Sequence, residues 1–545
     1  MVRRRKRSSE RPHREPTADT PRAPRWSETP KARYGIPPLV MTATLALGVW
    51  TFDSKLSLSG DNAEFIVLAR SLAQGEGLSY IHSPEPGPAT KYPFGFPLLL
   101  APLAWAFPDD WVPMKALVLA LFALGMGMLY QLARERVGVW PALAVVALSL
   151  MAGRSYLTHD AAGMAFGPML LHFSHQVMSE VPYLTFSLLA LWLVDRGVGR
   201  DGLRGNGWLL GGLGCTIWAC FIRTAGIALA AAVASHLLLR RDFRRCLLFV
   251  GATLVCWLPW TLRNQAVGSG GVYLKQLLMV NPYRPEQGWL DLPGFLERFI
   301  GQVDRYLRGW PEVLVPSLSG TDSILHPGPL LLIVLASAAT VLCIRRGEHL
   351  LLLYTAFYMG MLLLWSWPGE RFLVPVVPVV VLLGVWTVLQ VRDRLAAMGR
   401  AAHHAGRLAA WGCLAAWLIA HAGGVGRLAD YAGHGYPANW LRYYEAGKWI
   451  EANTPEEAVV LCRKGFWMHV VSGRRVVGFP FEEPGAVLAH MEREGVDFVV
   501  VERLGYRQTD DYLVPAIYEY RDRFQVVWYD DAVPTGVLRF LPATP

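Results

Sequence analysis

The sequence predicts an α-helical polytopic membrane protein with about eleven transmembrane helices, followed by a small C-terminal α/β domain. Hydrophobic residues make up 53% of its 545 residues and charged residues only 17%, whereas soluble domains carry about 25% charged residues. Apolar segments of near membrane-spanning length recur between residues 37 and 426. After residue 427, short Val-rich runs alternate with amphipathic stretches, as in small α/β folds. This composition excludes a string of soluble domains and a disordered chain.

The chain begins with a basic segment, residues 1–36, which contains eleven Lys and Arg against four Asp and Glu. It is rich in Pro, Ser and charged residues, as disordered segments are. Because Lys and Arg are enriched on the cytoplasmic side of membrane helices, we expect a disordered cytoplasmic tail. No aromatic interleaving and no folded nucleic-acid reader follow this segment, so no nucleic-acid partner is expected.

Residues 37–426 are the predicted transmembrane domain. The predicted spans lie at about 37–52, 113–133, 138–153, 181–195, 207–222, 224–240, 246–263, 328–344, 349–367, 372–390 and 408–426. A further apolar piece at 94–107 is expected to dip into the membrane. The connections expected in the cytoplasm hold fifteen Lys and Arg, against eleven in the much longer opposite connections. This alternation favours both the number of spans and the orientation.

With the N-terminus in the cytoplasm, the loops 53–112, 153–180 and 264–327 and the domain 427–545 lie outside it. We therefore expect a multi-pass protein of the cell (inner or plasma) membrane with an extracytoplasmic C-terminal domain. Within that domain, the run NTPEEA predicts a helix with Thr454 as its N-cap and a Pro at its first position. A strand is predicted to follow at about 458–462.

Charged side chains near the spans are functional candidates, because a charge at membrane depth is costly unless it is paired or solvated. Asp61 and Glu64 lie three residues apart at the start of a predicted helix over about 62–74, which places both carboxylates on one face. Glu180 lies at the outer mouth of another span. The other candidates on this side of the membrane are Lys91, Tyr92, Arg223, Arg263, Arg371 and the two histidines His172 and His175.

Each candidate also has a structural interpretation. Asp61 could serve only as the N-cap of its helix, Glu180 only as an interface charge, and Arg263 and Arg371 only as snorkelling residues. The two histidines are either packed or solvated side chains, or contacts for a substrate or a metal. The functional interpretation is favoured because carboxylates and cations from five different elements end at one face of the membrane.

The chemistry of this set suggests transfer of a group from a lipid phosphate. Carboxylates can deprotonate a hydroxyl or amine nucleophile and stabilise positive charge that develops on a sugar. Several Lys and Arg side chains at one depth can hold a phosphate whose lipid tail lies between the spans. Together they predict a transferase that uses a lipid-phosphate-linked sugar.

The first outer loop contains LSGDNAEFIVLARSLAQGEGLSY followed by KYPFGFPLLLAPL, and the second outer loop leads into HQVMSEVPYLTFSLLALWL. These motifs resemble the first outer loop and the second acidic motif of the GT-C-type membrane glycosyltransferases, which include the protein O-mannosyltransferases and the aminoarabinose lipid A transferases. FIRTAGIALA resembles their basic turn, LPWTLRN their span end and ERFLVPVVPVV a later span, in the same order along residues 40–395. The resemblance implies a GT-C-like fold with Asp61 as the catalytic base. It also implies a donor-phosphate site drawn from Lys91, Tyr92, Arg223, Arg263 and Arg371.

One position departs from the pattern of that superfamily. Its members often carry Asp-Glu at the start of the first motif, whereas this chain has Asp61 followed by Asn62, with Glu64 later. The second acid is therefore open between Glu64 and Glu180. No cofactor is certain and a divalent cation is an open alternative, although seven cysteines without a CxxC pair do not indicate a zinc site.

The function predicted from the sequence is that of an integral membrane glycosyltransferase of the cell envelope, for hexosyl or pentosyl transfer. It would move a sugar from a polyprenyl-phosphate-linked donor to a lipid, glycan or protein acceptor on the extracytoplasmic face, with Asp61 as general base. The main alternative is a transporter or flippase of lipid-linked sugars, but the two halves of the chain show no similarity of the kind found in inverted repeats. The other alternative is a non-enzymatic membrane protein whose outer domain binds a ligand.

Overall fold

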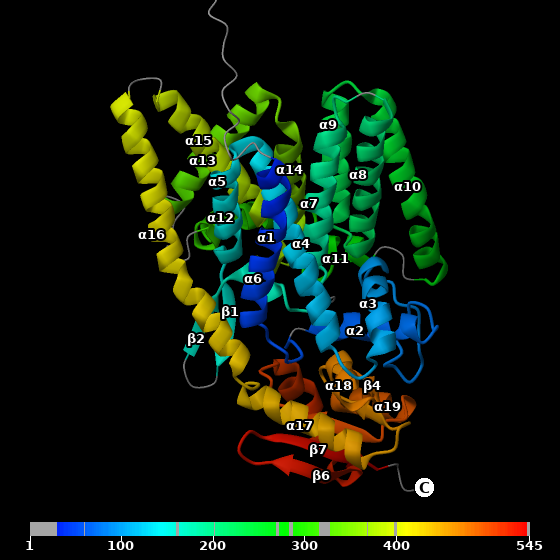
Figure 1. Ribbon diagram of the computed structural model, residues 1–545. Coiled ribbons are helices and arrows are strands. Elements are labelled where there is room, and N and C mark those ends of the chain that lie inside the picture. The colour runs from blue at the N-terminus through cyan, green and yellow to red at the C-terminus, as the bar shows by residue number, and fades with distance from the viewer. Residues whose placement is uncertain are drawn as a thin grey trace, which may run out of the picture.

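The computed structural model describes residues 30–541 except 59, 160–162, 201, 269–271, 283–286, 315–326, 368 and 397–399. Residues 1–29 of the basic tail predicted from the sequence therefore lie outside the described residues. Long helices run side by side in a bundle, and the C-terminal helices and strands lie at one end of it (Figure 1).

Each predicted span lies on a helix of this bundle. These helices are α1 (Pro30–Trp50), α4 (Val112–Val137), α5 (Val139–Met151), α7 (Glu180–Gly197), α8 (Gly202–Ile222), α9 (Gly226–Leu239), α10 (Phe243–Ala266), α13 (Pro327–Arg346), α14 (His349–Leu364), α15 (Val377–Ala396) and α16 (Arg400–Gly433). Within the described residues, five helical segments are long and apolar enough to cross a membrane: 112–137, 205–222, 243–266, 327–346 and 408–453. The number of crossings remains a prediction, because the other helices are shorter or less apolar.

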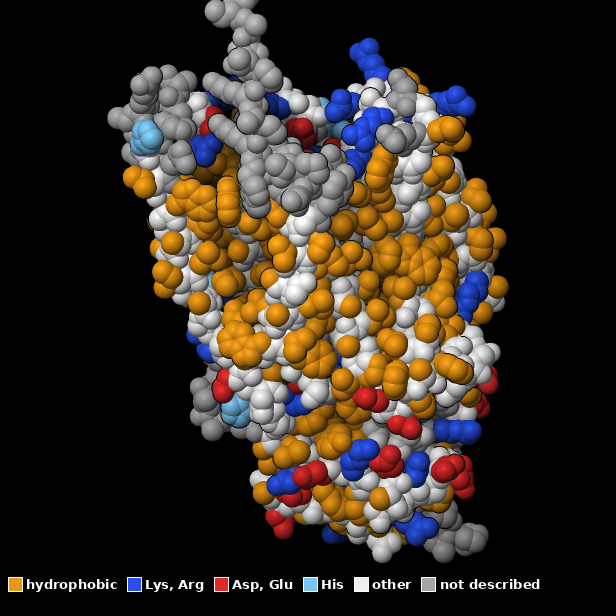
Figure 2. All heavy atoms as spheres, viewed as in Figure 1, with side chains coloured by type: hydrophobic (Ala, Val, Ile, Leu, Met, Phe, Trp, Pro, Cys, Tyr) orange, Lys and Arg blue, Asp and Glu red, His pale blue; other side chains and the backbone are white. Residues whose placement is uncertain are grey.

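The surface of the bundle is suited to lipid. Large apolar side chains of α10, such as Leu247, Val255 and Leu258, are exposed along its whole length. Figure 2 shows hydrophobic side chains over the middle of the bundle, Lys and Arg gathered near its upper end, and both signs of charge at its lower end. A wide apolar belt between charged ends is what a multi-pass membrane protein presents to the bilayer.

The end of the bundle that faces the C-terminal residues carries several short elements. Helices α2 (Gly60–Ala73) and α3 (Gly95–Ala106) lie there, and α3 is the apolar piece predicted to dip into the membrane (Figure 1). The other short elements are the antiparallel hairpin β1 (Ser155–His159) and β2 (Gly163–Gly167), and the helices α6 (Met169–Phe173) and α11 (Val272–Leu278). The loop between α10 and α13 also carries the longer helix α12 (Leu292–Leu314). The sequence analysis did not predict this hairpin or these three helices.

Two glycines allow close contacts that fix the positions of loops at this end. A Cβ atom at Gly95 would lie 2.6 Å from the backbone of Phe221, so only glycine lets α3 approach the end of α8 so closely. Gly226, at the start of α9, approaches the backbone of Cys220 in the same way, with a Cβ distance of 2.5 Å. These contacts fix the start of α3 and the turn between α8 and α9.

The C-terminal residues contain a five-stranded mixed sheet, where Val-rich runs predict strands. Its order is β4-β3-β5-β7-β6, with β3 parallel to β4 and β5, and β7 antiparallel to β5 and β6. The strands are β3 (Val459–Leu461), β4 (Arg475–Val477), β5 (Phe498–Val501), β6 (Phe524–Asp530) and β7 (Thr535–Phe540). The helices between or before them include α17 (Ala438–Asn453), α18 (Gly465–Ser472), α19 (Pro484–Arg493) and α20 (Val514–Glu519).

The predicted N-cap role of Thr454 is wrong. Thr454 follows the last residue of α17, and its hydroxyl donates to the carbonyl oxygen of Ile450 at 2.7 Å. The same hydroxyl accepts a hydrogen bond of 3.0 Å from Nε of the buried Arg474. The Pro after Thr454 ends the preceding helix instead of starting a new one, and the predicted strand follows as β3.

The C-terminal residues pack directly against α2 through α18. The amide of Val476 donates to the carbonyl oxygen of His82 at 2.7 Å, and the ring of Phe466 lies 4.1 Å from that of His82 and 5.6 Å from that of Tyr80. Tyr80 and His82 belong to the loop between α2 and α3. Contacts with the C-terminal residues therefore fix the position of this loop, which also carries Lys91.

Candidate functional site

The start of α2 brings two predicted carboxylates to one cation. The helix begins one residue before Asp61, so Asp61 and Glu64 lie on the same face about one turn apart. Lys91 Nζ lies 2.7 Å from Glu64 Oε2 and 3.6 Å from Asp61 Oδ1. The same ammonium group lies 4.4 Å from the centre of the Tyr92 ring. The structure thus brings four predicted residues of the first outer loop together.

A second group of charges comes from three later segments. Glu180 begins α7, Arg223 lies between α8 and α9, and Arg371 belongs to the short helix η4 (Glu370–Leu373). Arg223 Nη1 lies 3.0 Å from Glu180 Oε1 and donates to Ser179 Oγ at 2.9 Å. Arg371 Nη1 donates to Asp61 Oδ2 at 2.8 Å, while its Nε lies 3.9 Å from Glu180 Oε1. Arg371 therefore joins the two groups.

Six side chains form one series of alternating charge, which we call the charged chain. In spatial order its members are Glu64, Lys91, Asp61, Arg371, Glu180 and Arg223. The contact between Asp61 and Arg371 joins residues 310 positions apart in the sequence. Each charge has a neighbour of opposite sign, as charges withdrawn from water require.

Only one of the three carboxylates of the charged chain is open to a ligand. The side chain of Asp61 is 24% exposed, against 4% for Glu64 and 1% for Glu180. The two cations that contact Asp61 are also open, with 37% of Lys91 and 33% of Arg371 exposed. An accessible carboxylate therefore lies between two accessible cations.

The protonation of this carboxylate is set by its neighbours. Burial raises the pKa of Asp61, but Lys91 and Arg371 outweigh burial and lower the pKa to about 2. Asp61 is thus ionised at neutral pH, as a proton acceptor must be. Burial raises the pKa of Glu64, and its contacts with Lys91 and Tyr80 offset only part of this effect. Neighbouring carboxyl groups with pKa values shifted in opposite directions are common in active sites.

Three further side chains support the charged chain, and the sequence analysis did not single them out. The Tyr80 hydroxyl donates to Glu64 Oε1 at 3.1 Å, and Ser179 accepts from the guanidinium at the end of the charged chain. The centre of the Phe372 ring lies 4.9 Å from the guanidinium carbon of Arg371 and 5.5 Å from that of Arg223. Each of the three lies inside one of the motifs that resemble the GT-C pattern. Their place in these motifs is the only feature of the sequence that points to a role at the site.

Arg263 is placed apart from the other predicted cations. Its guanidinium donates to the carbonyl oxygens of Ala89 at 2.7 Å and of Leu78 at 3.1 Å. Both carbonyls belong to the loop between α2 and α3. Arg263 therefore braces the backbone of the loop that carries Lys91, and its guanidinium is used in that contact.

The two histidines lie beside this site and are not ionised. His172 Nδ1 is hydrogen-bonded to Ser155 Oγ, and Gln176 Nε2 lies 2.8 Å from His172 Nε2. Burial lowers the pKa of His172 to about 4, so its ring is neutral at pH 7. His175 is buried, and neither of its ring nitrogens has a hydrogen-bond partner among the described residues.

The side chains at this site do not fit a metal ion as they are arranged. Among the residues that the structure describes, no group of three or more His, Cys, Asp or Glu side chains could hold one. The carboxylates of the charged chain face Lys and Arg side chains instead of one another. A divalent cation needs several oxygen or nitrogen ligands that converge on one point.

Comparison with known proteins shows the fold. No family model matches the sequence, and no curated protein matches it significantly. ArnT from Cupriavidus metallidurans, solved bound to undecaprenyl phosphate, matches with a TM-score of 0.58 and 14% identity over 94% of this chain and 99% of that one. Its apo structure matches with a TM-score of 0.58 and 15% identity, over 93% of this chain and 98% of that one. The Archaeoglobus fulgidus oligosaccharyltransferase, solved with Zn and sulfate, matches with a TM-score of 0.55 and 14% identity, over 93% of this chain and 74% of that one.

Each match covers 93% or 94% of this chain. The resemblance to GT-C transferases that the motifs predict is therefore confirmed at the level of the fold.

Proposed function

We propose that this chain is an integral membrane glycosyltransferase that moves a sugar from a polyprenyl-phosphate-linked donor to an acceptor on the extracytoplasmic face. The observation that carries the proposal is the position of Asp61, an ionised and accessible carboxylate between Lys91 and Arg371. Displacement of a phosphate-linked sugar requires a proton acceptor beside cations that hold the phosphate. The shared fold with ArnT, which was solved with undecaprenyl phosphate, supports this class of lipid.

The donor phosphate would bind to the accessible cations of the charged chain. Lys91 and Arg371 offer an ammonium group and a guanidinium fork from opposite sides of Asp61, and Arg223 lies one carboxylate further along. Charge-assisted hydrogen bonds from a guanidinium to a phosphate are strong and bidentate. Because the phosphate competes with Asp61 for these cations, its arrival would release the carboxylate toward the acceptor.

The reaction is then a single displacement at the sugar. The acceptor oxygen bonds to the anomeric carbon while the bond from that carbon to the phosphate oxygen breaks, and its electron pair remains on the phosphate. Asp61 takes the acceptor proton, and Lys91 and Arg371 stabilise the negative charge that grows on the leaving phosphate. One displacement inverts the configuration of the anomeric carbon.

The two remaining carboxylates are proposed as positioning residues. Glu64 accepts from Tyr80 and from Lys91, and so fixes the direction of the ammonium group. Glu180 lies 3.0 Å from Arg223 and 3.9 Å from Arg371 and thereby orients both guanidinium groups. Neither carboxylate is accessible enough to receive a proton from an acceptor.

The predicted role of Arg263 in donor binding is proposed in an indirect form. Its two hydrogen bonds hold the loop backbone at Leu78 and Ala89, two residues before Lys91. Loss of the guanidinium would loosen this loop and displace the Lys91 ammonium group. Arg263 would thus affect the phosphate through Lys91, without touching it.

Replacement of Arg371 by Ala should weaken binding of undecaprenyl phosphate about 10- to 100-fold, since a hydrogen bond to a charged group contributes about 1.5–3 kcal/mol. Arg371→Lys should restore only part of the affinity, because an ammonium group cannot bind phosphate bidentately. Titration of the full-length protein in lipid nanodiscs measures the affinity, with the exposed Arg507→Ala as a matched control. An unchanged affinity in Arg371→Ala would place the phosphate elsewhere.

The orientation is a separate prediction. A cysteine introduced in residues 1–25 should react only with a reagent applied from the cytoplasmic side of the membrane. A cysteine at the exposed position Glu456 should react only with a reagent applied from the opposite side. The measurement is labelling of intact cells and inverted vesicles with a membrane-impermeant maleimide. Labelling of both positions from the same side would contradict the topology.

Transfer itself is tested with purified protein, radiolabelled polyprenyl-phosphate sugars and membrane extract. Label that leaves the lipid for another molecule is the expected result. Label that stays on the lipid and only changes leaflet would instead identify a flippase.

A further inference from the structure

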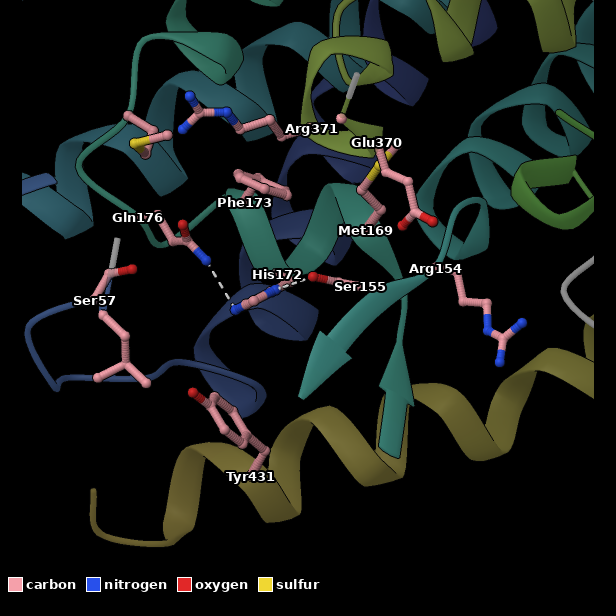
Figure 3. Close-up of a pocket in the computed structure, with 13 residues that line it drawn as sticks. Ser57, Arg154, Ser155, Met169, His172, Phe173, Gln176, Glu370, Arg371 and Tyr431 are labelled. Atoms are coloured by element: carbon pink, nitrogen blue, oxygen red, sulfur yellow. Dashed lines mark hydrogen bonds between the residues drawn. The ribbon is translucent and has the colours of Figure 1, made fainter. Parts of the chain in front are cut away.

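A cavity of about 550 Å³ lies beside the charged chain (Figure 3). Its walls come from the segment between α1 and α2, from β1 and α6, from the residues before α7, from η4 and from α16. Arg371 belongs to its wall and is the side chain that donates to Asp61. The cavity therefore ends one side chain away from the proposed base. Lys91, Tyr92 and Arg223 are not among its lining residues.

One wall of the cavity is a fixed row of neutral hydrogen-bonding groups. Figure 3 shows Gln176, His172 and Ser155 in line, with the imidazole between the amide and the hydroxyl. Because Gln176 Nε2 donates to His172 Nε2, the imidazole carries its proton on Nδ1 and donates it to Ser155 Oγ. The hydroxyl proton of Ser155 and the carbonyl oxygen of Gln176 then remain for a ligand. The row thus offers one donor and one acceptor without net charge.

Another part of the cavity wall holds an unpaired carboxylate. Glu370 is half-buried, and its carboxylate makes no hydrogen bond or ion pair within the part of the chain that the structure describes. The nearby Arg154 pairs with Glu312 instead, at 3.3 Å. Burial and the charge of Glu312 raise the pKa of Glu370 to about 7, so at neutral pH the group can both accept and donate hydrogen bonds.

Apolar surface completes the lining. Four apolar or aromatic residues also line the cavity, namely Phe173, Met169, Leu58 and Tyr431. Figure 3 shows Phe173 and Tyr431 on either side of the row that contains His172. Aromatic and apolar faces beside a few well-placed polar groups are typical of small-ligand sites. A sugar ring has this same pattern, with apolar C–H faces and a rim of hydroxyls that both donate and accept.

We propose that this cavity is the acceptor subsite and that it binds a sugar unit of the acceptor, oriented by Glu370 and by the row of Gln176, His172 and Ser155. The proposal rests on the proposed function, because it assigns the hydroxyl that attacks the donor. A second phosphate does not suit the interior of the cavity, because Arg154 is paired with Glu312, Arg371 is assigned to the donor phosphate, and no other Lys or Arg is among the lining residues. A lipid chain does not suit it either, because the polar groups would lose water without gaining partners.

The subsite also explains how one hydroxyl is selected. A sugar ring held both by Glu370 and by the row keeps a fixed orientation relative to Arg371. The hydroxyl that lies nearest Asp61 is then the one whose proton is taken. Orientation of this kind contributes to rate as well as to specificity.

The test uses the full-length protein in lipid nanodiscs and methyl glycosides of common hexoses and pentoses as probes, with binding followed by saturation-transfer NMR. At least one glycoside should bind to the wild-type protein. Gln176→Ala and Glu370→Ala should each weaken that binding at least tenfold, whereas Glu370→Gln should weaken it less, because an amide oxygen still accepts from a hydroxyl. The exposed Glu456→Gln serves as the matched control.

Affinity for undecaprenyl phosphate and the melting temperature are measured on the same samples. Both should stay close to wild type in the cavity variants, which shows that the fold and the donor site are intact. A wild-type protein that binds none of the glycosides, or cavity variants that bind them normally, would overturn the proposal. So would competition between the glycoside and a saturating polyprenyl-phosphate sugar, because the cavity would then hold the sugar of the donor. Glycoside binding without any undecaprenyl phosphate binding would contradict the proposed function instead, so the two failures are distinguishable.

Discussion

Asp61→Asn should lower the rate of sugar transfer by about 100-fold or more, the usual scale for loss of a general base. The substitution preserves the size of the side chain and one oxygen for Arg371, but it removes the ability to take a proton. Asp61 lies in the first turn of α2, where its carboxylate is bonded to Arg371 and lies beside Lys91. Because Asn is tolerated at such positions, the protein should fold and still bind undecaprenyl phosphate.

The measurement compares turnover, donor-lipid affinity and melting temperature in the same preparations. Asp522→Asn is a matched control, because Asp522 is an exposed carboxylate in the C-terminal residues. Glu64→Gln should reduce donor affinity through Lys91 and leave a measurable rate. Near wild-type turnover in Asp61→Asn would contradict the role of Asp61 as the base.

Arg223→Ala should lower the free energy of unfolding by about 3–5 kcal/mol, because removal of one partner leaves a buried charge uncompensated. Glu180 is 1% exposed, and Arg223 is its closest cation at 3.0 Å. The more distant Arg371, at 3.9 Å, cannot compensate fully while it is bonded to Asp61. The double variant Arg223→Ala/Glu180→Gln should recover most of the lost stability, since it removes the buried charge.

Thermal and denaturant unfolding in detergent measure these differences, with Arg507→Ala as a surface control. Equal instability of the single and double variants would mean that packing of the arginine, and not the charge of Glu180, dominates. Wild-type stability of Arg223→Ala would contradict the pairing itself.

The sequence predicts the local parts of the site better than its assembly. Asp61, Glu64 and Lys91 lie within one loop, and helical spacing alone places the two carboxylates on one face. The charge alternation of the connections places Arg371 on the same side of the membrane. It could not reveal that Arg371 bonds to Asp61, because this contact depends on how distant helices pack.

The same limit explains what the sequence analysis missed. The sequence predicts the depth of Arg263 in the membrane, but it does not predict the direction in which this side chain projects from α10. In the structure its guanidinium donates to the backbone carbonyl oxygens of Ala89 and Leu78. The β1–β2 hairpin is fixed by tertiary contacts: a Cβ atom at Gly167 would lie 3.2 Å from Leu428 of α16. The local rule for Thr454 failed because this residue ends α17, where its hydroxyl donates back to Ile450 and accepts from Arg474, twenty residues later.

The most direct test of the central claim is cleavage of the donor. Purified wild-type protein is mixed with a polyprenyl-phosphate sugar labelled in the sugar and with membrane extract, and the free polyprenyl phosphate and the label in other molecules are measured together. The account predicts that both products appear in equal amounts and that Asp61→Asn, which still binds the lipid, forms about 100-fold less of each. Formation of neither product by the wild-type protein, or equal formation by wild type and Asp61→Asn, would contradict it.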